Sequence, residues 1–154
     1  ITGDLQVDNN AILTVTGTVW VVGNVILSNN CVIRLDPGYG ATSGVIMTDG
    51  TVDVSNNCTF QGSGTPGSYI LLLTAKDAPA LTVMDISNNS AGVIYYAAKG
   101  RMRLSNNATA KEATAYGIDM SNNAIITYDS GLASAIFSSG PSGGRSLTQW
   151  REVP

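Results

Sequence analysis

Short apolar segments alternate with one recurring polar corner along most of this chain. The dipeptide Asn-Asn occurs six times and accounts for twelve of the thirteen asparagines. The copies are Asn9-Asn10, Asn29-Asn30, Asn56-Asn57, Asn88-Asn89, Asn106-Asn107 and Asn122-Asn123. Two apolar columns precede the pair: Leu5, Val25, Val52, Met84, Met102 and Ile118, then Val7, Leu27, Val54, Ile86, Leu104 and Met120. A mostly polar column lies between them, and this period-two alternation predicts a strand with one buried face before every pair.

The pattern resumes directly after each corner. A column of small residues comes first: Ala11, Cys31, Cys58, Ser90, Ala108 and Ala124. A second inward column follows it: Leu13, Ile33, Phe60, Gly92, Ala110 and Ile126. A third strand is expected in most repeats, near residues 18–22, 45–48, 69–74, 93–97 and 113–116. Because a corner that recurs along a chain is the mark of stacked repeats, the sequence predicts a repeat protein.

The predicted fold is all-β, a single-stranded, right-handed parallel β-helix (β-solenoid) of about six rungs. Asparagine tolerates the left-handed backbone of a tight corner, and its amide can both donate and accept between neighbouring rungs. We therefore expect a ladder of stacked amides. Its members are Asn10, Asn30, Asn57, Asn89, Asn107 and Asn123. Three loops rich in Gly or Pro, at 36–43, 61–68 and 74–80, are expected to project from one flank of this core.

Composition narrows the possible functions. The chain has 154 residues, only 12% of them charged, and a net charge of −3. No broad basic field is visible, so nucleic acid is not an expected partner. There is no histidine, which removes the usual nucleophile–base pairs and the commonest metal ligand. We expect no enzyme activity, no cofactor and no metal. No apolar run is long enough to cross a membrane.

Cys31 and Cys58 occupy the same small inward column on neighbouring rungs. Their separation would permit a disulfide, but parallel stacking aims the two Cβ atoms the same way. We therefore expect two free, buried thiols that act as small apolar fillers.

Two charged groups are candidates for a surface site. Asp53, Asp85, Arg103 and Asp119 fall in one outward column, where the simplest interpretation is a ladder of surface charges. A basic stretch adjoins Tyr95 and is the candidate site for an anionic glycan. Its candidate ligand-binding residues are Tyr96, Lys99, Arg101, Arg103 and Lys111.

We divide the chain into a β-helix over 1–137 and a Ser/Gly-rich tail over 138–154. The open end of a solenoid exposes apolar core, so Trp150 is predicted to cap the last rung. The alternative is a flexible linker. The chain begins inside its own pattern at Ile1, so we expect it to be a piece of a longer protein.

The succession of apolar strand, Ser-Asn-Asn-Ala, strand, Gly-Val-Ile strand and closing Trp-Arg-Glu-Val resembles the Asn-rich β-helical region of exported bacterial PilX-type pilus-assembly accessory proteins. Bactofilins, which polymerise end to end, are a poorer match. The first resemblance implies an extracellular or envelope location and envelope proteins, pilus proteins or glycans as partners. We expect a non-enzymatic structural or adhesive module that presents loops to a partner. The alternatives are a small carbohydrate-binding or polysaccharide-processing β-helix and a polymerising scaffold; the oligomeric state stays open.

Overall fold

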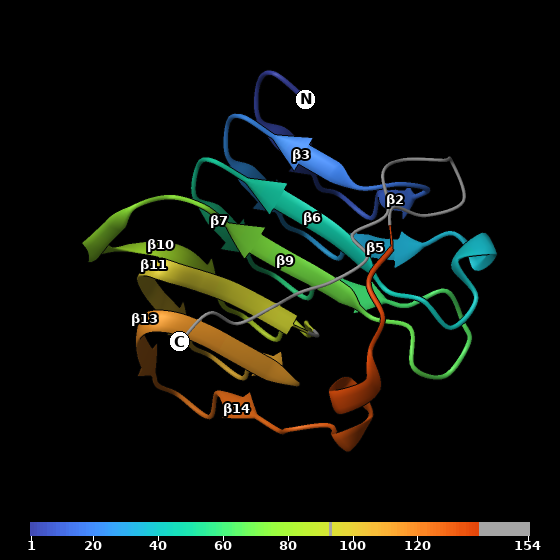
Figure 1. Cartoon of the computed structure of the whole chain (residues 1–154). Coiled ribbons are helices and arrows are strands. Elements are labelled where there is room, and N and C mark those ends of the chain that lie inside the picture. The colour runs from blue at the N-terminus through green and yellow to red at the C-terminus, as the bar shows by residue number, and fades with distance from the viewer. Residues whose placement is uncertain (93, 139–154) are drawn as a thin grey trace, which may run out of the picture.

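The computed structural model describes residues 1–92 and 94–138, and this part of the chain is all-β with two short 3-10 helices and no α-helix (Figure 1). The strands are β1 (Leu5–Val7), β2 (Ile12–Val15), β3 (Val19–Val21), β4 (Val25–Leu27), β5 (Val32–Leu35), β6 (Gly44–Thr48), β7 (Val52–Val54), β8 (Thr59–Gln61), β9 (Ile70–Thr74), β10 (Ala78–Ile86), β11 (Ile94–Leu104), β12 (Thr109–Ala110), β13 (Glu112–Met120) and β14 (Ile125–Ile126). The 3-10 helices are η1 (Pro37–Tyr39) and η2 (Ser130–Ser134).

Successive repeats return to the same three surfaces. Strands before the asparagine pairs form the first face: β1, β4, β7 and the C-terminal parts of β10, β11 and β13. Strands after the pairs form the second face: β2, β5, β8, β12 and β14. The remaining strands form the third face: β3, β6, β9 and the N-terminal parts of β11 and β13. Every one of these pairings is parallel, so the all-β, parallel part of the prediction is confirmed.

The register of the first face follows the sequence columns. Gln6 pairs with Ile26, Ile26 with Asp53 and Asp53 with Asp85. The column continues from Asp85 to Arg103 and from Arg103 to Asp119. A residue in one repeat therefore lies beside its counterpart in the next, with about 4.8 Å between neighbouring strands.

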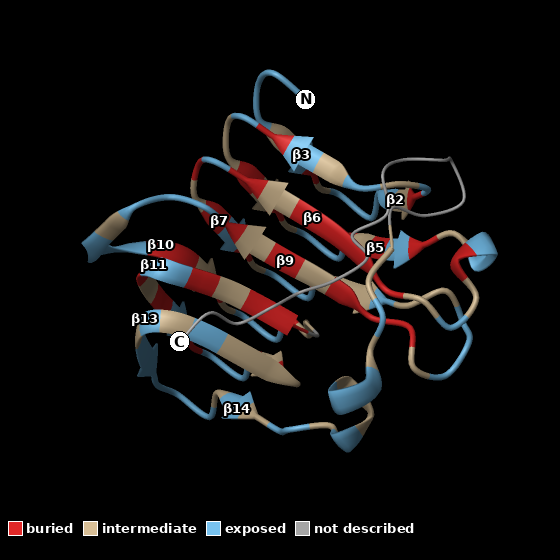
Figure 2. Cartoon of the chain, viewed as in Figure 1, coloured by how far each residue is buried: buried red, intermediate tan, exposed pale blue. Residues whose placement is uncertain are grey.

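A continuous apolar core fills the space between the faces. The apolar columns that precede the asparagine pairs lie in it, and Leu27, Val54, Ile86 and Leu104 are almost fully buried. The last repeat differs, because Ile118 and Met120 are exposed by 39% and 47%. In Figure 2 the buried positions concentrate in the middle strands, whereas β13 and β14 have only intermediate and exposed positions.

The corner between the first and second faces, which we name the ladder corner, consists of the asparagine pairs. All twelve paired asparagines have a positive φ, between 50° and 65°, the left-handed conformation that asparagine tolerates. In every pair after the first, the second asparagine donates its side-chain N–H to the preceding repeat at N···O distances of 3.0–3.4 Å. The first asparagines do the same from Asn56 onward, at 2.9–3.1 Å. The amides form two parallel ladders on the outside of the molecule.

The expectation of two free thiols is wrong. Cys31 and Cys58 are joined by a disulfide, with their Cα atoms 4.7 Å apart and both residues fully buried. That separation lies within the range that a disulfide bridges. The physical reason for the error is that neighbouring parallel strands bring the two Cα atoms close enough for modest side-chain rotation to join the sulfurs. The bond fastens two repeats together directly after the ladder corner.

The prediction that three loops share one flank is also wrong. Residues 36–43 and 61–68 both lie between the second and third faces, a position that we name the loop corner. Of residues 74–80, only 75–77 lie outside a strand: they connect β9 to β10, between the third and first faces, and this connection projects from the opposite side in Figure 1. Spacing between asparagine pairs measures the length of an insertion, but it does not say which corner holds it.

Candidate functional site

The two loops of the loop corner form one rigid platform. Ser68 Oγ donates to the carbonyl oxygen of Thr42 at 2.8 Å, and Ser63 Oγ donates to that of Gly40. Ser63 N–H in turn donates to Ser68 Oγ at 3.1 Å. These serines join loops that are more than twenty residues apart in sequence. We name residues 36–43 and 61–68 together the loop platform.

A third segment ties into the platform. After β14 the chain leaves the last repeat and runs back along the loop corner through η2 to residue 138 (Figure 1). Ser43 N–H donates to Ile136 O at 2.6 Å, and Ser138 N–H donates to Ser43 O at 2.9 Å. We name residues 129–138 the strap. It joins the sixth repeat to the second, so chain from the last repeat helps to hold the platform.

The start of the strap is held by Asp129. Lys111 Nζ lies 2.6 Å from Asp129 Oδ2, and Gly131 N–H donates to Asp129 Oδ1 at 2.9 Å. The Lys111 ammonium and then the Gly131 amide lower the pKa of the Asp129 carboxyl below its ordinary value. Lys111 Nζ also lies 5.1 Å from the centre of the Tyr69 ring, a cation–π distance.

A cleft of about 350 Å³ lies on one side of the platform. Arg34 lines it together with Asp36, Gln61 and Ser63. Arg34 Nε donates to Thr14 Oγ1 at 3.0 Å, and within the described residues Arg34 has no carboxylate within ion-pair distance. Its guanidinium is therefore a donor group available to a ligand carboxylate or hydroxyl.

A larger groove of about 520 Å³ lies on the other side of the platform, between the platform and the shorter later repeats. Phe60 and Tyr69 line one side, Ala91, Gly92 and Ala110 the floor and Lys111 one end. The groove exists because the fourth and fifth repeats turn at once into the third face, whereas the third repeat makes a long loop. Sequence reasoning missed it, although the change from Leu13, Ile33 and Phe60 to Gly92 and Ala110 in one column was the signal.

Tyr95 supports the floor of this groove from inside. Its ring packs edge-on against Phe60, with centroids 6.2 Å apart. Its hydroxyl lies where a Cβ on residue 92 would be, which is why glycine is required there. Burial raises the pKa of the Tyr95 hydroxyl far above its ordinary value, and the hydroxyl stays protonated. Among the described residues it has no hydrogen-bond partner.

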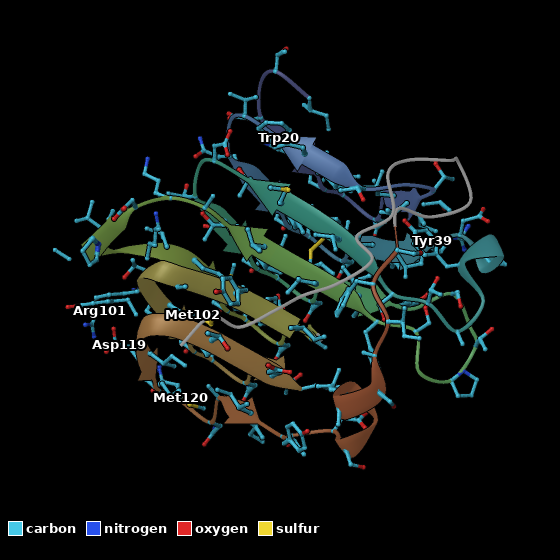
Figure 3. All side chains as sticks on the ribbon, viewed as in Figure 1. Trp20, Tyr39, Arg101, Met102, Asp119 and Met120 are labelled. Carbon is cyan, nitrogen blue, oxygen red and sulfur yellow. A yellow bond between two sulfur atoms is a disulfide. The ribbon has the colours of Figure 1, made fainter. Side chains whose placement is uncertain are left out.

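The residues of the predicted anion site do not form one free basic surface. Each of the four cations lies beside an aspartate: Lys99 by Asp77 at 3.4 Å, Arg101 by Asp119 at 2.8 Å, Lys111 by Asp129 at 2.6 Å, and Arg103 by Asp85. Figure 3 shows Arg101 and Asp119 side by side at the edge of the first face. Lys111 lies at the loop corner, and Tyr96 lies on the outside of the third face. Their role in ligand binding stays a prediction.

The predicted acidic column is continuous. Asp53 lies beside Asp85, and the pKa of Asp53 is raised, first by its partial burial and then by the Asp85 carboxylate. Arg103 forms an ion pair with Asp85. Asp119 forms its ion pair with Arg101, although its neighbour in the strand register is Arg103. Across residues 1–92 and 94–138, no group of three or more His, Cys, Asp or Glu side chains is placed to hold a metal ion.

The chain matches no protein-family model, no curated protein and no solved structure. In the part that the structure describes, no helix has the length and apolar character needed to cross a membrane. Trp150, the predicted cap, lies outside the described residues.

Proposed function

We propose that the chain is a right-handed, single-stranded parallel β-helix that serves as a rigid presentation module on a cell surface or in a cell envelope. Parallel in-register pairing on all three faces, two amide ladders and the return of each repeat to the same corners support the helical path. The single observation that carries the function is the loop platform, because its two loops are bonded to each other and to the strap. A surface that keeps its shape before contact loses less entropy when a partner binds.

The proposed partner is an envelope protein, a pilus protein or a glycan, and the module acts by adhesion rather than catalysis. The resemblance to the β-helical region of PilX-type accessory proteins suggests a pilus-associated setting. The carbohydrate-binding alternative is favoured by a specific observation, the two grooves beside the platform. Both are lined by hydroxyl groups, and the smaller cleft adds the Gln61 amide and the Arg34 guanidinium. Such groups recognise sugar hydroxyls and carboxylates.

The test compares two loop exchanges of similar kind. Replacing residues 63–67 by a Gly/Ser segment of equal length alters the platform, whereas the same treatment of residues 75–77 alters the opposite side. Both variants and the unaltered chain are assayed against a glycan array and against isolated bacterial envelopes, with a reducing-sugar assay for cleavage. The proposal predicts binding that is lost only in the first variant, without sugar release. Equal binding by all three, or release of reducing sugar, would contradict it.

A further inference from the structure

The outside of the third face is apolar, unlike the outside of the first face. Along β6 and β9, Ile46, Leu72 and the two terminal threonines point inward and are buried. The residues between them therefore point outward. They align in two columns, Val45, Leu71 and Ile94 in one and Trp20, Met47, Leu73 and Tyr96 in the other.

Exposure varies along these two columns, from 57% at Trp20 to intermediate values at Met47, Leu71, Leu73 and Tyr96. Val45 and Ile94 are only 9% and 7% exposed. In Figure 2, β6 and β9 carry only buried and intermediate positions. The first face offers the contrast, because its outward column is polar at every position except Ile26, and Gln6, Asp53, Arg103 and Asp119 are exposed. An apolar sheet face of this extent is normally covered.

The described chain ends beside this face. Phe137 forms a parallel bridge with Ser43, which immediately precedes β6, and Ser138 N–H donates to Ser43 O at 2.9 Å. Residues 139–154 continue from that edge. Sixteen extended residues span about 50 Å, whereas the strands β3, β6, β9, β11 and β13 together span about 20 Å. The segment is therefore long enough to cross the face.

The composition of residues 139–154 fits such a surface. Leu147, Trp150 and Val153 are spread over seven residues and separated by polar or charged ones. A segment of this kind can place apolar groups on a sheet and keep the others in water. We propose that residues 139–154 dock on the outside of the third face, with Trp150 against the column of Met47, Leu73 and Tyr96, and do not cap the last repeat. This docking goes beyond the presentation function and does not depend on it.

The test follows Trp150 fluorescence in the full chain. Trp20→Phe leaves Trp150 as the single indole, because the chain has two tryptophans. In that background Leu73→Lys places a charge on the third face, and Met120→Lys places the same charge at the open end of the array. Both replaced side chains are partly exposed, so the fold is expected to persist, and circular dichroism with urea unfolding checks this for each variant.

The expected result is an indole that is shielded in the Trp20→Phe protein, with blue-shifted emission and slow quenching by acrylamide. Leu73→Lys should shift the emission to the red and raise quenching severalfold, while Met120→Lys leaves both unchanged. An effect of Met120→Lys as large as that of Leu73→Lys would overturn the proposal in favour of an end cap. An indole already exposed in the Trp20→Phe protein would overturn it as well.

A second measurement covers the case in which Leu73→Lys fails to fold. A chain that ends at Ser138 should bind a hydrophobic dye such as ANS more strongly than the full chain, because the third face is uncovered. It should also self-associate in analytical ultracentrifugation. Unchanged dye binding, or a full-length chain that already associates through this face, would mean that residues 139–154 are not its cover.

Discussion

The ladder corner is nearly identical in every repeat, whereas the loop corner differs from one repeat to the next. At the ladder corner, twelve asparagines share one backbone conformation and repeat the same contacts. At the loop corner, the connection between the second and third faces ranges from one residue at Lys111 to eight between β8 and β9. Yet the long loops there are also bonded, through serines particular to them. At the ladder corner, repetition fixes the register of the strands. At the loop corner, the freedom to vary loop length allows a surface that is particular to these repeats.

The difference follows from how each corner meets its neighbours. An asparagine pair in the left-handed conformation can stack its amides on those of the next repeat only if that repeat has the same corner. A projecting loop does not have to match a copy of itself in the next repeat, so a change in its length costs little. We therefore expect substitutions at the ladder corner to change mainly stability, and substitutions at the loop corner to change mainly binding.

The largest effect should come from changing the length of each corner by one residue. A glycine inserted between Asn56 and Asn57 interrupts both ladders and the backbone bond from Asn57 N–H to Asn88 O. We expect a loss of about 4 kcal/mol of unfolding free energy or complete unfolding. A glycine inserted between Gly64 and Thr65 should cost less than about 1 kcal/mol. Urea unfolding monitored by circular dichroism measures both, and equal costs would remove the distinction between the corners.

The disulfide that follows the ladder corner should be the next largest contribution. It closes a 27-residue separation, for which chain entropy gives about 3.5 kcal/mol. A thiol reagent added to the unfolded, unreduced protein should label no cysteine, and should label two after reduction. Reduction should lower the urea midpoint. Two labelled thiols before reduction would show that the cysteines are free.

Single asparagines test the two properties of the corner separately. Asn57→Ala loses two ladder bonds and places alanine at a φ of 65°, so we expect a loss of about 2 kcal/mol. Asn57→Gly keeps the conformation and loses only the amide, so about 1 kcal/mol is expected. The matched control at the loop corner is Thr65→Ala, for which urea unfolding should detect almost no change. If alanine and glycine cost the same at position 57, backbone conformation is not what asparagine supplies.

The smallest effect should appear at the strap and depend on pH. The pKa of Asp129 is lowered by Lys111, so the stabilising contribution of this carboxylate is complete above its ordinary pKa. It is lost as pH falls through the lowered value. NMR of the Ser43 and Ser138 amides should show the strap detaching only at strongly acidic pH.

The control for the strap is Lys111→Met, which removes the cation and leaves the aspartate. The strap should then detach at a higher pH, near the ordinary range of an aspartate. An unchanged titration would mean that Lys111 does not hold Asp129.

The asparagine pairs made the all-β, parallel part of the fold predictable, because few residues besides glycine accept two successive left-handed positions. The location of the 74–80 loop was not predictable, because spacing between pairs does not divide an insertion among corners. The disulfide was missed because we assumed that two Cβ atoms pointing the same way on neighbouring repeats could not be joined.

The candidate site was harder to predict for the same reason. The loop platform depends on bonds between Ser63, Ser68 and backbone carbonyls, and such contacts leave no periodic signal. The apolar outside of the third face was hidden in the run Ile70–Leu73, because an unbroken apolar run does not say that both of its faces are apolar. The sequence shows smaller side chains in the column at Gly92 and Ala110. That this leaves a groove could be recognised only once the position of Tyr95 was known.

The most direct test of in-register stacking is one distance along the outward column of the first face. Gln6 and Asp119 are separated by five strand steps, which places their backbones about 24 Å apart. Spin labels on cysteines at these two exposed positions, with the native disulfide left intact, report that distance by double electron–electron resonance. The account predicts a single narrow distribution centred near the backbone separation once the label arms are included. A broad distribution, or one centred far from it, would contradict the stacked arrangement on which the ladders, the platform and the third face depend.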